Sequence, residues 1–387
     1  MFDMEELMKK IPDLPKIRTE NRLFYSPESN EKNKYREINK EIKKKYNINL
    51  VSRDTIIKNI ITILTQGSQN NSKLADLNIS IIRTDISNFY NSIDKHLLYK
   101  KISHSNILAK ESLETLKPLF FSNSVKGVPL GLPFSGSLSE IYLEDFDRDI
   151  TVFFDPIFYF RYVDDIIIIL NNNSYTGEEK ENFKQNSIKK LDNIFSSYSL
   201  KRNDEKTIFT YYNKKNRNLE FEYLGYHFKS STNNLSIDIS DSKTDKIIRQ
   251  IKHSFGVFKQ GNHSSVNFWK LYYRLQHTIY DVTSTNEISQ ELHFGLAYSY
   301  KFINSSRQLN KIINQTKYYI FSCKLSSYKQ FMLLQLISYE NSILEKKYNY
   351  NKITKKQFKL IKKRLNIVYK DASIEHIFYV IHNNKFK

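Results

Sequence analysis

The sequence predicts an α+β fold, in which helices flank an antiparallel sheet and an all-helical region follows. The run of residues 158–170 places two adjacent acids, Asp164 and Asp165, between aromatic and aliphatic segments that favour strand. Residues 79–85, with isoleucines at their start, are typical of a buried strand. From Ser242 onward the pattern predicts four to six helices and no convincing strand.

Charge is the main signal in the composition. The 387 residues allow two or three domains, and 60 Lys and Arg residues outnumber 41 Asp and Glu residues, for a formal net charge of +19. This excess favours a polyanionic partner, nucleic acid first and an anionic membrane second. The same lysine content is expected from an AT-rich genome, so an explanation without any partner stays open.

Several classes of protein are excluded. A single cysteine, Cys323, rules out a disulfide framework and a thiolate zinc cluster, and it fits a reducing cytoplasm. The nine histidines show no zinc-ligand spacing. Residues 1–14 lack the apolar centre of a signal peptide, and no apolar run approaches membrane-spanning length. We therefore expect a soluble cytoplasmic protein with no membrane partner.

The N-terminal elements come first in order. Helices are expected over residues 31–46, with a solvated Lys-rich face, and over 51–64, with an isoleucine stripe. A loop is expected at residues 67–72.

The strand 79–85 introduces the first acidic residue of interest. Its alternation puts Arg83 and Asp85 on one face, and Asp85 ends the strand with a carboxylate above the sheet. An ordinary ion pair between these two residues is the competing interpretation. Asp94 is the candidate N-cap of the next helix.

A helix over residues 106–121 leads into a segment rich in glycine and proline, residues 127–137. Ser135 or Ser137 can cap the helix that follows. A glycine-rich loop before a helix N-terminus brings backbone close to a ligand, although ordinary loops have the same composition.

The paired acids are predicted to lie in a hairpin turn formed by Val163, Asp164 and Asp165. Adjacent carboxylates repel one another, so a divalent metal is the expected neighbour, while capping of turn N–H groups is the alternative. The elements after the hairpin are a helix at 177–197, strands at 208–212 and 221–228, where Gly225 allows a bend, and a short hairpin closed by 235–239.

In this order the segments resemble the motif series of the reverse transcriptases, whose fold is that of a right-hand polymerase. The resemblance covers roughly residues 50–240, and bacterial abortive-infection and defence-associated enzymes are the most similar group. The matching segments are Asp85–Ile86 with Phe89–Tyr90, residues 127–135, Tyr162–Asp165, Asn203–Thr207 and Leu224–Tyr226. Leu130 departs from the glutamine usual in intron and retroviral enzymes, and Val282-Thr283-Ser284 departs from the Val-Thr-Gly of retron enzymes.

The resemblance implies a domain layout. It assigns residues 1–80 to fingers and N-terminal helices, 81–100 to palm, 101–125 to a fingers insertion, 126–240 to the remaining palm with the primer grip, 241–310 to a helical thumb, and 311–387 to a C-terminal helical extension.

It also implies two Mg²⁺ ions, with Mn²⁺ as an alternative, because hard oxygen ligands suit these metals. Asp85 and Asp164 would be the bridging ligands, Asp165 a weaker third, and the carbonyl of Ile86 an additional oxygen. Lys206 would neutralise the departing pyrophosphate, or it is simply an exposed lysine.

Further roles carry over from the family. Tyr90 would act as the steric gate against a ribose 2′-OH, with a core aromatic as the alternative, and Arg161 would be structural or contact backbone. The other expected nucleotide-binding residues are Arg83, Phe89, Gly131 and Pro133. The expected primer and template residues are Tyr162, Leu224, Gly225 and Tyr226.

The expected function is RNA-directed DNA synthesis from deoxynucleotides on a non-coding RNA template in antiphage defence. Template-independent or protein-primed DNA synthesis is one alternative, and an RNA-binding scaffold with a vestigial palm is another. A partner protein or a homo-oligomer is left open.

Overall fold

The computed structural model describes residues 16–19, 22–67, 72–122, 124–172, 176–215, 217–261, 263–285, 291–338, 343–369 and 372–382. The expectation for residues 1–14 and most of the loop expected at 67–72 lie outside this range. The chain divides into two compact units, Met1–Leu219 and Glu220–Lys387. Each unit is described by itself.

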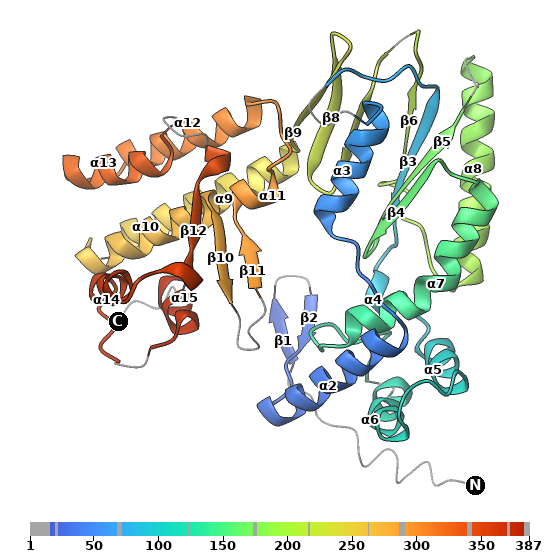
Figure 1. Ribbon diagram of the computed structural model, residues 1–387, viewed down its shortest axis with the longest axis horizontal. Helices are drawn as coiled ribbons and strands as arrows, with labels where there is room; N and C mark the ends of the chain where they lie inside the picture. The colour runs from blue at the N-terminus through green and yellow to red at the C-terminus, as the bar shows by residue number, and fades with distance from the viewer. Residues whose placement is uncertain are drawn as a thin grey trace. The chain divides into compact units, whose positions relative to one another are not determined.

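The first unit alternates helices with the strands of a central sheet (Figure 1). Its elements are β1 (Lys16–Thr19), β2 (Arg22–Tyr25), α2 (Ser29–Lys45), α3 (Arg53–Leu64), β3 (Ile79–Asp85), α4 (Phe89–Ser92), α5 (Lys95–His104), α6 (Lys110–Phe121), α7 (Ser135–Phe154), β4 (Phe158–Tyr162), β5 (Asp165–Asn171), α8 (Gly177–Ser197) and β6 (Ile208–Tyr212). The helices expected at 31–46, 51–64 and 106–121 are therefore confirmed with shifted ends, and the helix expected at 177–197 and the strand expected at 208–212 match residue for residue.

The central sheet has the order β4-β5-β3-β6, and every neighbouring pair is antiparallel. Ile166, Ile167, Ile168 and Ile169 of β5 are fully buried, as expected of a strand covered on both faces. The β4–β5 hairpin turns at Val163 and Asp164, which confirms the predicted hairpin, but Asp165 begins β5 rather than lying in the turn.

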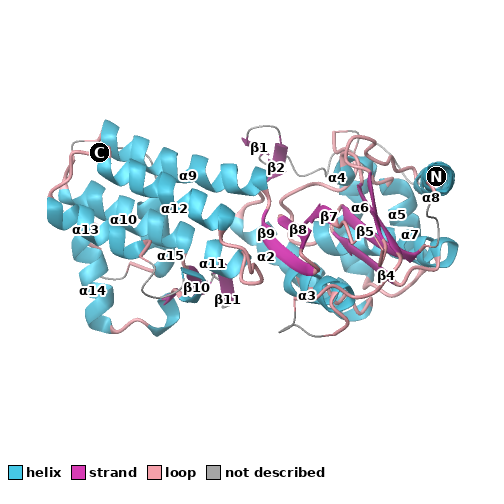
Figure 2. Ribbon diagram, turned by 90° about the horizontal axis from the view of Figure 1, so that it is seen from above, coloured by secondary structure: helices cyan, strands magenta, loops and turns pink. Residues whose placement is uncertain are grey.

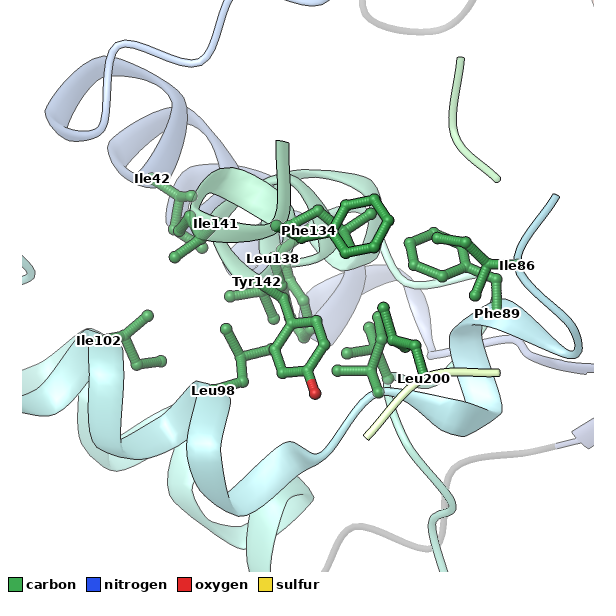
Figure 3. Close-up of a cluster of buried hydrophobic side chains, with 14 of the residues drawn as sticks. Ile42, Ile86, Phe89, Leu98, Ile102, Phe134, Leu138, Ile141, Tyr142 and Leu200 are labelled. Atoms are coloured by element: carbon green, nitrogen blue, oxygen red, sulfur yellow. The ribbon is translucent and has the colours of Figure 1, made fainter. Parts of the chain in front are cut away.

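One large hydrophobic core joins the sheet to the helices around it. Leu138, Ile141 and Tyr142 of α7 pack with Ile42 of α2 and with Leu98 of α5 (Figure 3). Alternate residues of the strands, such as Ile82 and Ile168, belong to the same core. These contacts fix α7 against the sheet.

Two capping predictions have opposite outcomes. Asp94 caps α5, because its side chain accepts hydrogen bonds from the N–H groups of His96 and Leu97. The predicted serine cap of α7 is wrong, since α7 has no side-chain cap. Ser135 instead donates to the carbonyl of Pro129 and Ser137 to Oδ1 of Asn39, so tertiary partners occupy both hydroxyls.

The second unit begins with a three-stranded antiparallel sheet and continues with helices (Figure 2). Its elements are β7 (Glu220–Tyr223), β8 (Tyr226–Ser231), β9 (Asn234–Ile239), α9 (Asp241–Gln260), α10 (Ser265–Ile279), β10 (Asp281–Thr285), β11 (Glu291–Phe294), α11 (Leu296–Ser299), α12 (Arg307–Phe321), α13 (Ser327–Leu336), β12 (Lys347–Asn349), α14 (Lys355–Arg364) and α15 (Ile374–His382), with short 3₁₀ turns at Ile343–Glu345 and Tyr350–Lys352.

Two details of the prediction are wrong here. The single strand expected at 221–228 is a hairpin, because Leu224 and Gly225 both have positive φ, 47° and 80°, and turn the chain between β7 and β8. The region after residue 241 is not entirely helical, since β11, β10 and β12 form a second sheet. The α+β class itself is confirmed, and the closure of β8 by β9 is as expected.

Within the described residues, no helix combines the length and the apolar character that crossing a membrane requires.

Candidate active site

The central sheet brings the three predicted carboxylates to one end. Asp85 ends β3 and lies opposite Asp165, the first residue of β5, in the strand register. Asp164 precedes Asp165 in the turn, and its carbonyl accepts a hydrogen bond of 3.2 Å from the N–H of Ile86. Segments 80 residues apart in the sequence are therefore joined by backbone pairing at the acidic residues.

Lys206 reaches the same place from the segment between α8 and β6. Its ammonium group forms a salt bridge with Oδ2 of Asp85, whose side chain is only 6% exposed. The segment is tied to the end of β3 by two backbone hydrogen bonds, from Ser87 to the carbonyl of Lys201 and from Asn203 to the carbonyl of Asp85. The hydrogen bond to Asp85 raises the pKa of Lys206, which therefore stays cationic at neutral pH.

The second oxygen of Asp85 bears directly on metal binding. Oδ1 is buried and has no hydrogen-bond partner. A buried carboxylate oxygen without a partner costs free energy unless a cation or a donor reaches it. This orphaned atom is what a metal ligand would look like before its ion is bound.

The carboxylates do not form a finished ligand set, however. Across the described ranges, no group of three or more His, Cys, Asp or Glu side chains is arranged to hold a metal ion. The salt bridge to Lys206 engages one oxygen of Asp85, so the acids lie close to one another without forming a complete set of metal ligands.

The pKa of Asp165 reflects both its burial and its charged neighbours. Burial raises the pKa of Asp165 most, and the charges of Asp164 and Asp85 raise it further, while Arg83 and Lys206 lower it. No ion pair joins Arg83 to Asp85, two residues that the structure describes. The simple Arg83–Asp85 pair is therefore not formed, and Lys206 is the partner of Asp85.

Tyr90 and Phe89 on α4 differ in accessibility. Phe89 is 4% exposed and belongs to the main core, so little of its surface is left for a nucleotide (Figure 3). Tyr90 is half-buried against it, with 5.0 Å between ring centroids. Burial raises the pKa of Tyr90, as does the nearby charge of Asp164, which places the phenol beside the acidic turn.

The glycine-rich loop has a structural explanation. At Gly131, where φ is 96°, a Cβ would lie 2.5 Å from the carbonyl oxygen of Tyr25. The N–H of Tyr25 donates to the carbonyl of Leu130 at 2.8 Å. Gly131 is therefore required for packing on β2, and contacts of Gly131 and Pro133 with a nucleotide remain predictions.

The predicted primer residues fall in both units. Tyr162 is 38% exposed and lies opposite Asp165 in the β4–β5 register. Leu224 and Gly225 form the β7–β8 turn of the second unit. Tyr226 is fully buried and donates to the carbonyl of Ser299, and its expected role in positioning a primer stays a prediction.

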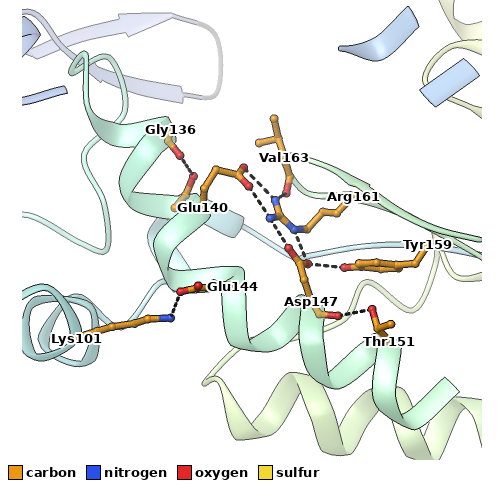
Figure 4. A network of polar contacts seen from close by, with 10 residues as sticks. Lys101, Gly136, Glu140, Glu144, Asp147, Thr151, Tyr159, Arg161 and Val163 are labelled. Carbon is orange, nitrogen blue, oxygen red and sulfur yellow. Dashed lines mark hydrogen bonds and ion pairs between the residues drawn. The ribbon is translucent and has the colours of Figure 1, made fainter. Parts of the chain in front are cut away.

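One group near the site was not predicted from sequence. Arg161 of β4, expected only to be structural or to contact backbone, binds Glu140 and Asp147 of α7 and the carbonyl of Val163 (Figure 4). The spacing of seven residues between the two acids, which places both on one helix face, was the available signal.

Comparisons with known proteins identify the family of this chain. The family model for "Reverse transcriptase (RNA-dependent DNA polymerase)" matches residues 25–228, more than half of the chain. The curated "Retron Ec83 reverse transcriptase" of Escherichia coli is 26% identical over 153 residues, which is 37% of this chain and 49% of that protein. The chain thus spans about half the length of this relative.

Solved structures with similarity include two yeast telomerases. Telomerase from Candida albicans with a fragment of telomeric RNA has a TM-score of 0.43 at 12% identity, covering 82% of this chain and 63% of that chain. Apo telomerase from Candida tropicalis has a TM-score of 0.45 at 13% identity, covering 84% and 60%.

Proposed function

This chain belongs to the reverse transcriptase (RNA-dependent DNA polymerase) family, and from that premise we propose that it copies RNA into DNA. The observation that carries the proposal is the pairing of β3 with β5, which sets Asp85 opposite Asp165 beside the Asp164 turn, with Lys206 on Asp85. These are the positions at which the sequence resembles the catalytic motifs of the family.

In the proposed reaction a primer 3′-hydroxyl attacks the α-phosphorus of a deoxynucleoside triphosphate. A new O–P bond forms, the bond to pyrophosphate breaks, and the proton of the hydroxyl passes to water. Divalent cations, Mg²⁺ or Mn²⁺, held by Asp85 and Asp164 with help from Asp165 and the Ile86 carbonyl, would lower the pKa of the hydroxyl and stabilise charge on the attacking and leaving oxygens. The unpartnered Oδ1 of Asp85 supports this assignment.

Lys206 has two roles in this proposal. Without substrate its ammonium group compensates the buried charge of Asp85. Its side chain is 56% exposed, so it has room to move toward a triphosphate. Because its pKa is raised, it would arrive protonated and could donate a proton to the leaving pyrophosphate.

Primer extension by the purified full-length chain tests the proposal. We expect incorporation of deoxynucleotides on an RNA template with a DNA primer, in the presence of Mg²⁺ or Mn²⁺ and not with EDTA. Asp164→Asn should abolish incorporation. Arg148→Gln, which removes an exposed arginine of α7, is the matched control and should leave it intact. Failure of the parent protein on every template, primer and metal tested would contradict the proposal.

We further propose that the template is a dedicated non-coding RNA and that the synthesis serves antiphage defence in the cytoplasm. The similarity to a retron enzyme supports this assignment. The protein would be purified from its host and the associated RNA and DNA sequenced. DNA complementary to one co-purified RNA is expected, together with loss of phage protection in Asp164→Asn. DNA without any RNA complement, or DNA that resists phenol extraction until protease is added, would favour untemplated or protein-primed synthesis.

A further inference from the structure

Arg161 uses its whole guanidinium group. Its side chain is 5% exposed. Nε and Nη2 donate to the two carboxylate oxygens of Asp147 at 2.8 and 2.7 Å, and Nη2 and Nη1 donate to those of Glu140 at 2.7 and 3.1 Å. The remaining donor of Nη1 reaches the carbonyl of Val163 at 3.0 Å. All five N–H groups of the arginine are thereby engaged.

The hydrogen bond to Val163 differs from the other four, because its acceptor lies in the β4–β5 turn and not on α7. Val163 is a β-branched residue with φ of 61°, in the left-handed region that such residues avoid. A conformation of this kind costs roughly 1–3 kcal/mol and persists only where the surroundings impose it. The bond from Arg161 to the Val163 carbonyl is one such constraint.

That carbonyl belongs to the peptide group joining Val163 to Asp164. The next carbonyl, that of Asp164, accepts the N–H of Ile86 from the end of β3. The turn is thus held from two sides, by Arg161 before Asp164 and by β3 after it. Together these bonds set the direction in which the Asp164 side chain leaves the backbone.

We propose that Arg161 is a positioning residue for Asp164, which transmits the fixed location of α7 to the acidic turn through the carbonyl of Val163. The inference rests on the proposed function, because it concerns the same reaction. The supporting geometry is shown in Figure 4, where Glu140 and Asp147 project from α7 toward the guanidinium group and Val163 lies on its other side.

A purely structural role would be different. If Arg161 served only to fasten β4 to α7, its loss would lower stability and leave the folded enzyme fully active. The two roles separate because Lys keeps the charge and can pair with one carboxylate, but it lacks the planar fork needed to hold two acids and a carbonyl together.

The test compares Arg161→Lys with Arg148→Lys in the full-length chain. Arg148 lies on α7, pairs with Asp145 at 2.9 Å and is 66% exposed, so it is a matched control. Single-nucleotide incorporation would be measured at a temperature at which circular dichroism shows each variant fully folded. We expect the kcat of Arg161→Lys to fall about 10- to 100-fold while KM for the deoxynucleotide changes by less than about threefold. Arg148→Lys should match the parent.

A parental kcat in folded Arg161→Lys would overturn the proposal, and so would an effect on KM alone. If that variant does not fold, Glu140→Gln replaces it, because this change weakens one side of the fork and keeps the Asp147 pair. The same fall in kcat without a change in KM is expected there. An inactive parent enzyme would instead refute the proposed function, so the two failures are distinguishable.

A double-mutant cycle with Val163→Gly gives a second, independent readout. Glycine adopts positive φ without strain, so the conformation of the turn depends less on the bond from Arg161. If Arg161 acts through the Val163 carbonyl, the kcat loss caused by Arg161→Lys should be at least threefold smaller in the Val163→Gly background. Fully multiplicative losses would show that the two residues act separately and would contradict the proposed route.

Discussion

Two groups of acidic residues flank the same turn and differ in how completely their carboxylates are hydrogen-bonded. Glu140 and Asp147 on α7 are saturated, with hydrogen bonds from Arg161 to each carboxylate and from the Tyr159 hydroxyl to Asp147. On the other side Asp85 has one lysine on one oxygen and nothing on the other. Completeness of pairing, rather than the presence of charge, therefore distinguishes a structural ion pair from a functional site.

The physical reason lies in the cost of burial. A buried charge that loses its partner destabilises a protein by several kcal/mol, so structural groups are paired on every side. A group that must receive a ligand keeps an unsatisfied atom and tolerates the cost. The Arg161 group should therefore govern stability as well as position, and the Asp85 group should govern chemistry.

The largest effect is expected at Asp85. Asp85→Asn removes the charge that would hold a metal while keeping the size of the side chain. We expect kcat to fall by about 10³-fold or more, with a change in Tm of less than about 4 °C, because the lost salt bridge has an exposed lysine as partner. Primer extension and thermal unfolding measured on the same sample check both parts.

Asp147→Asn is the counterpart in the saturated group. It removes one of two carboxylates from a buried arginine, and we expect a loss of about 2–3 kcal/mol, which is roughly 5–10 °C in Tm. Its effect on kcat should be smaller than that of Asp85→Asn by at least about tenfold. If the two variants lowered Tm equally, or if Asp147→Asn were the less active one, the contrast between the two groups would be lost.

An effect on kcat of intermediate size is expected at Lys206, the partner of Asp85. Lys206→Gln should lower kcat about 10- to 100-fold, the range typical of a lost general acid. The raised pKa of Lys206 means that its charge persists as pH rises through neutrality and is lost only in the alkaline range. A kcat profile with no lysine-dependent fall between pH 6 and about 9 is expected, and Lys206→Arg should retain more activity than Lys206→Gln. If kcat fell near neutral pH in the parent but not in Lys206→Gln, Lys206 would lose its proton near neutrality, which would contradict the raised pKa.

Tyr90 stands between the two groups, since the charges of Asp164, Glu140 and Arg161 all act on its phenol. If its ring excludes a ribose 2′-OH, Tyr90→Val should raise incorporation of ribonucleotides relative to deoxynucleotides by about tenfold or more. Tyr90→Phe keeps the ring and should preserve discrimination. Competition between the two nucleotides on one primer measures the ratio. Equal ratios in all three proteins would leave Tyr90 as a packing residue.

Local pattern predicted much of the first unit. The helix Gly177–Ser197 was predicted residue for residue from its charged amphipathic pattern, and the structure adds a capping box formed by Thr176 and Glu179. The placement of Asp85 and the Asp164 turn followed from strand alternation and from the order of the family motifs. These features are encoded within short stretches, so a sequence alone is enough to find them.

What escaped prediction depends on distant partners. The hydroxyls of Ser135 and Ser137 fitted a helix cap locally, but Pro129 and Asn39 take them in the folded chain. Strand β12 pairs in parallel with β10, and its three residues carry too little pattern to be recognised. Arg161 finds its acids 14 and 21 residues earlier on a helix whose facing side only packing defines.

The smallest expected effect concerns stability and pH at Asp165. Burial, followed by the charges of Asp164 and Asp85, raises the pKa of Asp165 above its usual value of 3.8. The folded state therefore holds this proton more tightly than the unfolded chain, and stability falls as pH rises from about 3.8 through the folded pKa. Asp165→Asn removes this penalty.

In metal-free buffer with EDTA, Asp165→Asn should raise Tm by about 2–4 °C at pH 7, or about 1 kcal/mol for a domain of this size. The gain should vanish well below pH 3.8, where the carboxylate is protonated in both states. Asp155→Asn changes an exposed acid at the end of α7 and serves as the control. Because Mg²⁺ would relieve the same repulsion in the parent, added Mg²⁺ should narrow the difference at pH 7. If the difference in Tm between Asp165→Asn and the parent changed with neither pH nor Mg²⁺, the carboxylate of Asp165 would not be repelled by Asp85 and Asp164. The contrast between the acidic site and the acids of α7 would then rest on Asp85 alone.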